Sequence, residues 1–381
     1  MSTTYSRRDI LRSVKRVVIK IGSGALTTKE GLHRDLIYAL CEDISRLMKK
    51  RGMEIILVSS GAIASGIKKM GFSQRPQSIS QQQAAAAIGQ STLMHVYEES
   101  FKKHGRKVAQ ILVTRDDLTN RKRYLNTRNT LFTLLNWKVI PIINENDTVV
   151  VDEIKFGDND NLSAMIANLT GAHLVINLTN IDGLYNDDPR LSRDAQCISL
   201  VEKVTSKLEK KASSIPGALG KGGMESKVKA AKQAALRGIP TIIANGLTKH
   251  VINTIFEGKD VGTLFLPQQI PMRSRKHWIA FTKSPKGKIV VDEGAEAALI
   301  KKGKSLLPSG IVAMSGKFNI GNSVLILNWR EKKIAVGLVN YQSPEIEKIM
   351  GHKSSEIEKI LGYKHDDEII HKDNLVLMDG V

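Results

Sequence analysis

Short apolar runs rich in Val and Ile recur along the first 265 residues and alternate with helix-length segments. The runs read VVIKI, EIILVSS, KVAQILV, VIPIIN, LVINL and PTIIA. The segments between them include residues 34–50, 81–104, 121–136, 161–170 and 224–237. This alternation predicts an α/β fold in which helices cover both faces of a mainly parallel sheet. Ligands of such sheets bind beyond the carboxyl ends of the strands.

The pattern changes near residues 267–278, where PQQIPMRSRKHW carries two prolines and a basic stretch. Beyond it, the short runs KIVVD, SVLILNW and KIAVGLVNY are separated by turn signals and predict a small, mainly β module. We therefore expect a first domain over residues 1–268, a linker over 269–283 and a second domain over 284–381. Within the second domain, the near-repeats SPEIEKIMGHK and SSEIEKILGYK each predict a short helix that ends at a glycine.

The composition is that of an ordinary globular protein, with 41% hydrophobic and 25% charged residues among 381. The chain lacks the apolar run of about 18 residues that a membrane span needs. Its start, MSTTYSRRDILRSVKR, lacks the apolar core of a secretory signal. Cys41 and Cys197 do not have the number or spacing of a disulfide framework or a zinc site. We expect a cytoplasmic protein without membrane contact.

The net charge of +19 is compatible with binding to nucleic acid, with an anionic small molecule or with a solvated basic surface. Residues 286–381 hold 14 Lys and Arg against 13 Asp and Glu, so nearly all of the excess lies in the first 285 residues. There it is spread over many predicted helices, which favours a solvated basic face.

Lys20 interrupts the first apolar strand, in the stretch VVIKIGSGAL. A buried charge must be paired or must meet a ligand of opposite sign. Gly22, Ser23 and Gly24 follow at once, and glycine lets backbone amides approach an anion closely. A phosphate site and an edge lysine beside a tight turn both explain this stretch.

A second glycine-rich stretch, SIPGALGKGGMESKVKAA, leads into a predicted helix that carries Lys227 in its first turns. Glycine amides, a helix start and a lysine together are typical of an anion site, because a lysine near a helix start otherwise opposes the helix dipole. A glycine linker before a basic helix is the alternative. In a third stretch, LVSSGAIASG, Ser59 and Ser60 start a helix of small residues, either as an anion site or only as caps.

Two clusters of Asn and Asp, NEND at 144–147 and GDNDN at 157–161, follow the VIPII strand. Such residues favour turns because their side chains bond their own backbone, yet a turn needs fewer of them. Lysines beside glycine loops, with acids and amides nearby, suit phosphoryl transfer, which depends mainly on positioning and charge neutralisation. An acceptor carboxylate is already ionised at neutral pH and needs no general base, and no histidine occurs in these motifs.

Taken in order, seven motifs resemble signatures of the amino-acid kinase family, in particular of its members that phosphorylate glutamate. They are VVIKIGSGAL, VSSGAIASG, LVTRDDLTNRKRYLNTRNTLFTLL, PIINENDTV, IKFGDNDNLSA, LTNIDGLYNDDPR and GKGGMESKVKAA. The resemblance covers nearly the whole chain and includes a C-terminal module similar to the PUA domain of RNA-modifying enzymes. It implies ATP-dependent phosphorylation of the γ-carboxylate of L-glutamate to glutamyl 5-phosphate, the first step of proline biosynthesis, with Mg²⁺ accompanying ATP.

The resemblance also implies roles for individual residues. Lys20 and Lys227 would steady the transferring phosphoryl group, while Asp158 and Asp160 would organise substrate and catalysis. Glutamate would be bound by Ser60, Asn144, Asp147 and Asn159. ATP would be bound by Gly22, Ser23, Thr179, Asn180, Lys221, Gly222, Gly223, Met224 and Lys227. No residue is assigned to a metal. Asp160 is also placed to cap a helix over residues 161–170.

The sequence departs from the family pattern at two places. An acid commonly follows the threonine of the nucleotide strand, where this chain has Asn180, and a threonine often stands in the glycine loop, where it has Lys221. Asn180 can still hydrogen-bond a ribose or a base, and Lys221 adds attraction for phosphates.

The resemblance further implies a homo-oligomer, feedback inhibition by proline, and a glutamyl phosphate reductase that accepts the product. Two alternatives stay open, namely a kinase of aspartate or N-acetylglutamate and an RNA-binding or RNA-modifying protein that acts through the PUA-like module. The KIGSGA turn differs from the KFGGTS-like turn of aspartate kinases, and an acid-rich pocket suits the blocked amine of N-acetylglutamate poorly. The near-neutral charge of the C-terminal module makes RNA an unexpected partner.

Overall fold

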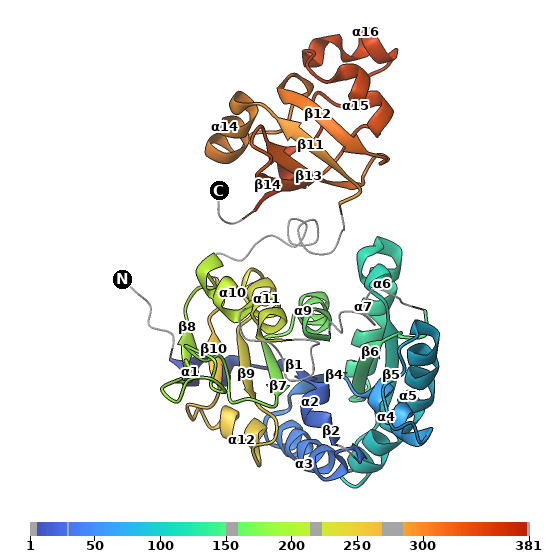
Figure 1. The fold of residues 1–381 in the computed structure, drawn as a ribbon, viewed down its shortest axis with the longest axis vertical. Helices are drawn as coiled ribbons and strands as arrows, with labels where there is room; N and C mark the ends of the chain where they lie inside the picture. The colour runs from blue at the N-terminus through green and yellow to red at the C-terminus, as the bar shows by residue number, and fades with distance from the viewer. Residues whose placement is uncertain (1–5, 29, 150–158, 214–222, 269–284, 379–381) are drawn as a thin grey trace. The chain divides into compact units, whose positions relative to one another are not determined.

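The computed structural model describes residues 6–28, 30–149, 159–213, 223–268 and 285–378 (Figure 1). The chain divides into two compact units, Met1–Pro271 and Met272–Val381. The linker expected over residues 269–283 lies outside the described residues. In the described ranges, every helix is too short or too polar to traverse a lipid bilayer.

The first unit is built around an eight-stranded sheet with the order β5-β6-β4-β1-β7-β9-β10-β8. Its strands are β1 (Arg16–Ile21), β4 (Glu54–Ser59), β5 (Val108–Val113), β6 (Ile140–Glu145), β7 (Leu174–Thr179), β8 (Leu200–Val201), β9 (Thr241–Asn245) and β10 (Thr263–Phe265). The six strands from β5 to β9 in this order run parallel, and β10 pairs antiparallel with β9. The mainly parallel sheet expected from the sequence is confirmed.

Helices cover both faces of this sheet (Figure 1). One face packs against α1 (Arg7–Ser13), α3 (Arg34–Arg51), α5 (Ile79–Lys102) and α12 (Val251–Phe256). The other packs against α6 (Arg115–Thr119), α7 (Arg121–Asn136), α9 (Asn159–Thr170) and α11 (Met224–Ala235). In β1, Val18 and Ile19 enter opposite layers, because successive side chains of a strand point to opposite faces. Shorter elements complete the unit, namely α2 (Ser23–Leu26), β2 (Thr27–Thr28), β3 (Gly31–Leu32), α4 (Ala62–Lys69) and α10 (Ser206–Ser213).

Helices α4 and α5 pack with their backbones in direct contact. A Cβ atom added to Gly66 of α4 would lie 1.7 Å from the carbonyl oxygen of Ala85, and one added to Gly89 of α5 would lie 1.9 Å from that of Ala62. The close approach of the two helices therefore requires both glycines. The contact also fixes the start of α4, which follows Ser59, Ser60 and Gly61.

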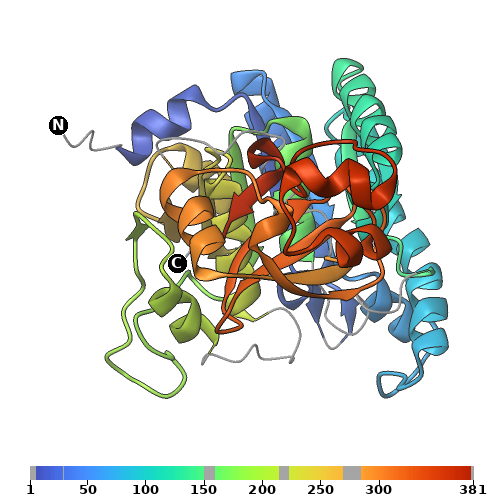
Figure 2. The same cartoon turned by 90° about the horizontal axis from the view of Figure 1, so that it is seen from above.

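The second unit, coloured orange to red in Figure 2, is a five-stranded sheet with the order β12-β11-β13-β14-β15. Its elements are β11 (Gly287–Val291), α14 (Glu293–Lys302), β12 (Ile311–Gly316), β13 (Ser323–Asn328), β14 (Lys333–Leu338), α15 (Ser343–Ile349), α16 (Ile357–Leu361) and β15 (Leu375–Leu377). The near-repeats form α15 and α16, and Gly351 and Gly362 follow them with φ of 80° and 81°. These left-handed glycines end the two helices, as predicted. The five-stranded sheet also confirms the expected mainly β module.

Candidate active site

The carboxyl ends of four neighbouring parallel strands, β6, β4, β1 and β7, lie along one edge of the first sheet. Lys20 projects from β1, Asn144 from β6 and Asn177 from β7. Helices α9 and α11 begin at this edge and contribute further polar side chains. Ligands of parallel sheets bind at this edge, so the polar groups stand where a substrate is expected.

Asp160, at the start of α9, joins the two predicted lysines in a buried charged centre. Its Oδ1 accepts a hydrogen bond from Lys20 Nζ at 2.5 Å, and its Oδ2 accepts one from Lys227 Nζ at 3.1 Å. All three side chains are between 1% and 7% exposed. Oδ1 also accepts from Asn177 Nδ2 at 2.8 Å, and Oδ2 from Ser226 Oγ at 2.6 Å. Lys20 is therefore paired, as its place in an apolar strand predicted.

The pKa of the Asp160 carboxyl lies well below its ordinary value. Burial by itself would raise this pKa, but the charges of Lys20 and Lys227 and the hydrogen bonds from Lys20 and Ser226 outweigh burial and lower it. Asp160 therefore stays ionised and holds two ammonium groups side by side. The expectation that Asp160 caps a helix over residues 161–170 is wrong, because α9 already begins at Asn159 and the carboxylate binds the lysines instead.

A second, uncharged cluster surrounds Asn159. Its Nδ2 donates to Ser60 Oγ at 2.9 Å and to Asn144 Oδ1 at 3.0 Å, and Asn144 Nδ2 donates in turn to Gln90 Oε1 at 2.9 Å. Within the described part of the chain, Asn159 Oδ1 and Gln90 Nε2 are buried without a hydrogen-bond partner. Buried polar atoms are rarely left unpaired, so these two atoms are available to a polar ligand.

Asp147 follows β6 and is half-buried. Its charge acts on Arg75. Burial lowers the pKa of the Arg75 guanidinium, and the nearby Asp147 charge offsets part of this shift. The Arg75 guanidinium also donates to Gln82 Oε1 at 3.1 Å. Asp147 therefore stands close to an arginine that the sequence analysis did not single out.

Residues expected to hold ATP gather around the turn after β1 and the end of β7. A Cβ atom on Gly22 would lie 3.3 Å from Lys20 Nζ, so the glycine leaves room for that ammonium group. A Cβ atom on Gly24 would lie 3.3 Å from Cγ of Asn180, and Thr179 Oγ1 donates to Asn180 Oδ1 at 3.4 Å. The structure thus places Asn180 beside the glycine turn.

Ser23 is exposed at the start of α2, and Gly223 directly precedes α11. The side chain of Met224 is buried in an apolar cluster, so only its backbone can contribute to a nucleotide site. Three other expected site residues, Asp158, Lys221 and Gly222, lie outside the described residues.

Sequence reasoning missed Asn177, Ser226 and Gln90, which complete the two clusters. Asn177 interrupts the apolar run LVINL as Lys20 interrupts VVIKI, so the same signal was available for it. Ser226 and Gln90 lie on helices, where a polar residue carries no comparable signal.

The described residues contain no group of three or more His, Cys, Asp or Glu side chains that could hold a metal ion. Asp160 is also unsuited to a cation, because both of its carboxylate oxygens already accept hydrogen bonds from ammonium groups. The carboxylates of the described residues therefore do not form a site that would hold Mg²⁺ by protein ligands alone.

Family comparisons agree with this fold. Residues 15–245 match the model of the amino acid kinase family, and residues 287–361 match that of the PUA domain. The class is therefore an amino acid kinase domain followed by a PUA domain.

Among curated proteins, the chain is 53% identical over 373 residues to the glutamate 5-kinase of Geobacter metallireducens, an alignment that covers 98% of this chain and 100% of that protein. It is 52% identical to the glutamate 5-kinase of Syntrophus aciditrophicus, with 98% and 97% covered. It is 48% identical to that of a Thermoanaerobacter species, with 96% and 98% covered. The chain belongs to the glutamate 5-kinase group of the amino acid kinase family.

Proposed function

We propose that the chain transfers the γ-phosphoryl group of ATP to the γ-carboxylate of L-glutamate and so forms glutamyl 5-phosphate, the first step of proline biosynthesis. Relatives that share about half of its residues over nearly their whole length are named glutamate 5-kinase. The observation that carries the proposal is the centre in which Lys20 and Lys227 share the Asp160 carboxylate.

Lys20 and Lys227 neutralise the charge of the phosphoryl group as it moves. The ionised γ-carboxylate attacks phosphorus, the bond from phosphorus to the ADP oxygen breaks, and no proton changes place. Such a transfer needs prearranged positive charge more than a general base. Asp160 acts as a positioning residue, since it holds the two ammonium groups together before the substrates arrive.

Glutamate is held by the uncharged cluster. Asn159 Oδ1 accepts from the α-ammonium group, and Gln90 Nε2 donates to the α-carboxylate. Both atoms are buried and lack partners among the described residues. Ser60 and Asn144 orient Asn159 through its amide nitrogen. Asp147 adds a negative charge for the ammonium group.

ATP is held by the turn after β1, by the end of β7 and by the glycine-rich stretch that leads into α11. These sites comprise Gly22, Ser23, Thr179, Asn180, Lys221, Gly222, Gly223, Met224 and Lys227. Mg²⁺ would be held largely by the phosphates of ATP, because the described residues of the site offer few free carboxylates.

The family membership supports four further parts of the proposal. The protein works in the cytoplasm, assembles as a homo-oligomer, is inhibited by proline, and passes its product to a glutamyl phosphate reductase.

The test is ATP consumption by the purified full-length chain with L-glutamate, L-aspartate or N-acetyl-L-glutamate, with the acyl phosphate trapped by hydroxylamine. We expect turnover of glutamate, and a kcat/KM for aspartate about 10- to 200-fold lower, the range that one missing methylene group produces. A preference for aspartate or for N-acetylglutamate would assign the chain to another amino acid kinase. Absence of trapped product with all three would refute the proposal.

A further inference from the structure

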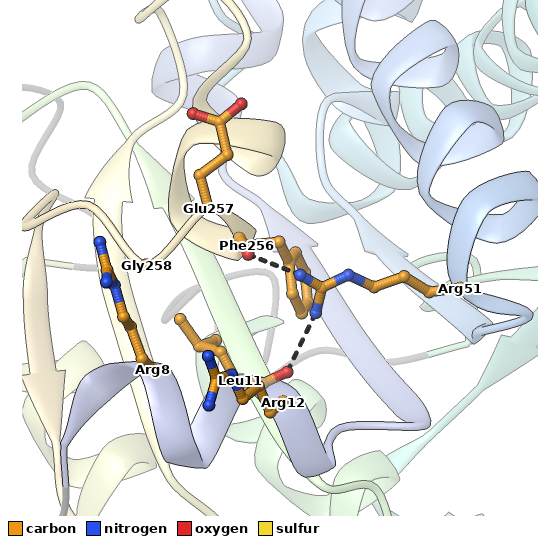
Figure 3. Close-up of a pocket in the computed structure, with 7 residues that line it drawn as sticks. All are labelled: Arg8, Leu11, Arg12, Arg51, Phe256, Glu257 and Gly258. Carbon is orange, nitrogen blue, oxygen red and sulfur yellow. Dashed lines mark hydrogen bonds between the residues drawn. The ribbon is translucent and has the colours of Figure 1, made fainter.

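Helix α1, the end of α3 and the end of α12 line an open cavity of about 260 Å³ (Figure 3). It is lined by Arg8, Leu11, Arg12, Arg51, Phe256, Glu257 and Gly258. These helices precede β1 and β4 or follow β9, so the cavity lies near the amino ends of β1 and β4, away from the candidate active site. We propose that this cavity binds a compact multivalent oxyanion of the pyrophosphate kind, and this inference does not depend on the proposed function.

Arg51 has a structural role that needs no ligand. Its Nη1 donates to the carbonyl oxygen of Leu11 at 3.2 Å, and its Nη2 donates to that of Phe256 at 2.8 Å. Its guanidinium carbon also lies 5.3 Å from the centre of the Phe256 ring. Basic side chains commonly satisfy the last carbonyls of helices in this way. Arg51 therefore joins the ends of α1, α3 and α12 and brings one positive charge to the cavity.

Arg8 and Arg12 are exposed and have no such structural role. They lie one turn apart on α1, where like charges at positions i and i+4 repel each other. Within the described residues, neither side chain forms a hydrogen bond or an ion pair. Arg7 on the same helix shows the contrast, since it binds Asp260 at 3.1 Å and the carbonyl oxygen of Val261 at 2.6 Å. The helix dipole favours Arg12 in the last turn but opposes Arg8 near the start.

The acid of the cavity does not neutralise these arginines. Glu257 pairs with Lys259 Nζ at 2.8 Å, and Figure 3 shows its carboxylate pointing away from Arg12 and Arg51. Gly258, with φ of 78°, lets the Arg8 side chain lie against the end of α12, because a Cβ atom there would lie 2.6 Å from Cγ of Arg8. The cavity thus gathers three positive charges on a lining whose only acid is already paired.

A multivalent oxyanion matches this lining better than a single halide ion. The guanidinium group presents a planar pair of donors that fits phosphate or carboxylate oxygens in bidentate fashion. A cavity of about 260 Å³ holds several non-hydrogen atoms, since one water occupies about 30 Å³ in the liquid. Pyrophosphate carries several charged oxygens, enough to meet more than one guanidinium group.

The experiment is a calorimetric titration of the full-length protein with pyrophosphate, together with its melting temperature in pyrophosphate and in sodium chloride of equal ionic strength. The cavity variant is Arg8→Gln/Arg12→Gln. The matched control is Arg193→Gln/Lys302→Gln, which removes the same charge from two exposed positions. We expect the cavity variant to bind pyrophosphate at least about ten-fold more weakly than the parent, as loss of charge-assisted bonds predicts, while the control binds like the parent.

Two further measurements complete the test. Without an anion, the cavity variant should melt at the same temperature as the parent or higher, because removing the two arginines relieves their repulsion. A lower melting temperature would show that Arg8 and Arg12 serve the fold, and would overturn the inference. A Lys227→Gln variant should still bind pyrophosphate in the cavity, so its titration should keep the binding signal that the cavity variant loses. If Lys227→Gln abolishes all pyrophosphate binding and the cavity variant does not, the anion binds at the candidate active site and the inference is wrong.

Discussion

Asn159 and Asp160 are neighbours at the start of α9, yet their side chains enter two different environments. The Asp160 carboxylate accepts hydrogen bonds from two lysines, an asparagine and a serine. The Asn159 amide keeps a buried oxygen without a partner among the described residues. The charged centre is thus assembled before substrate arrives, whereas the uncharged cluster has a position that a substrate can complete.

The free energies of burial account for this difference. An unpaired charge in the interior costs far more than an unpaired amide, so a folded chain tolerates the second and not the first. Under the proposed function, the charged centre therefore serves the fold and the reaction together, while the uncharged cluster gives up some stability in favour of recognition. Substitutions in each of the two clusters separate these contributions.

The largest effect is expected from Asp160→Ala. The change leaves Lys20 and Lys227 buried without their shared carboxylate, and loss of one member of a buried ion pair destabilises by about 3–5 kcal/mol. Urea unfolding of the purified variants measures the loss. Asp116→Ala, at an exposed position of α6, is the control and should change the free energy of unfolding by less than about 0.5 kcal/mol. Equal stabilities of the two variants would contradict the role given to Asp160.

Lys20→Ala and Lys227→Ala should each lower kcat by about 100-fold or more, the range for loss of one prearranged electrostatic donor. The loss falls mainly on kcat because the charge acts in the transition state. Steady-state kinetics with saturating glutamate and ATP measure it, with the exposed Lys102→Ala as the control. A variant that keeps kcat within a few-fold of the parent would remove that lysine from the catalytic centre.

Asp147→Asn tests the recognition side of the comparison. Loss of a charge-assisted bond of about 1.5–3 kcal/mol to the α-ammonium group should raise the KM for glutamate roughly ten- to hundred-fold. The KM for ATP should stay near that of the parent, because the residues proposed for ATP lie elsewhere. If NEND is only a turn, the substitution will be nearly silent, since Asn serves a turn as well as Asp does. A rise in the KM for ATP alone would place Asp147 at the nucleotide.

The contribution of the charged centre to stability should fall as the pH is lowered. The folded pKa of Asp160 lies below its ordinary value of 3.8, so its contribution to stability is present above pH 4 and is lost as the pH falls through the folded pKa. Unfolding free energies of the parent and of Asp160→Asn, measured from pH 5 downward, should converge. Parallel pH profiles would show that Asp160 does not contribute this dependence.

The sequence predicted the regular part of the fold well, for physical reasons. A helix was expected over residues 121–136, and α7 spans Arg121–Asn136. The strand β6 follows from the uninterrupted apolar run in VIPIIN, because a strand buried on both faces carries few polar residues. The strands β8 and β10 have two and three residues. They are too short to show a periodicity, and the antiparallel pairing of β10 escaped prediction.

The candidate site could be predicted in parts but not as an arrangement. Lys20 carried a local signal, since a charge in an apolar strand requires a partner. That its partner is Asp160, 140 residues further along the chain, depends on how the helices and strands meet. Arg75 illustrates the same limit, because a single arginine in a polar loop carries no signal until Asp147 is seen beside it.

The contact between α4 and α5 has a consequence for the range of substrates. Gly66 and Gly89 bring the two main chains together, and no side chain lies between them that could be trimmed to shift one helix against the other. The helix α4 begins just after Ser60, and Gln90 directly follows Gly89 on α5. The distance between these ends of the amide cluster is therefore set by main-chain atoms. If the amide cluster holds glutamate as proposed, an effort to make the enzyme accept an amino acid of another length would have to begin at Asn144, on a strand outside this pair.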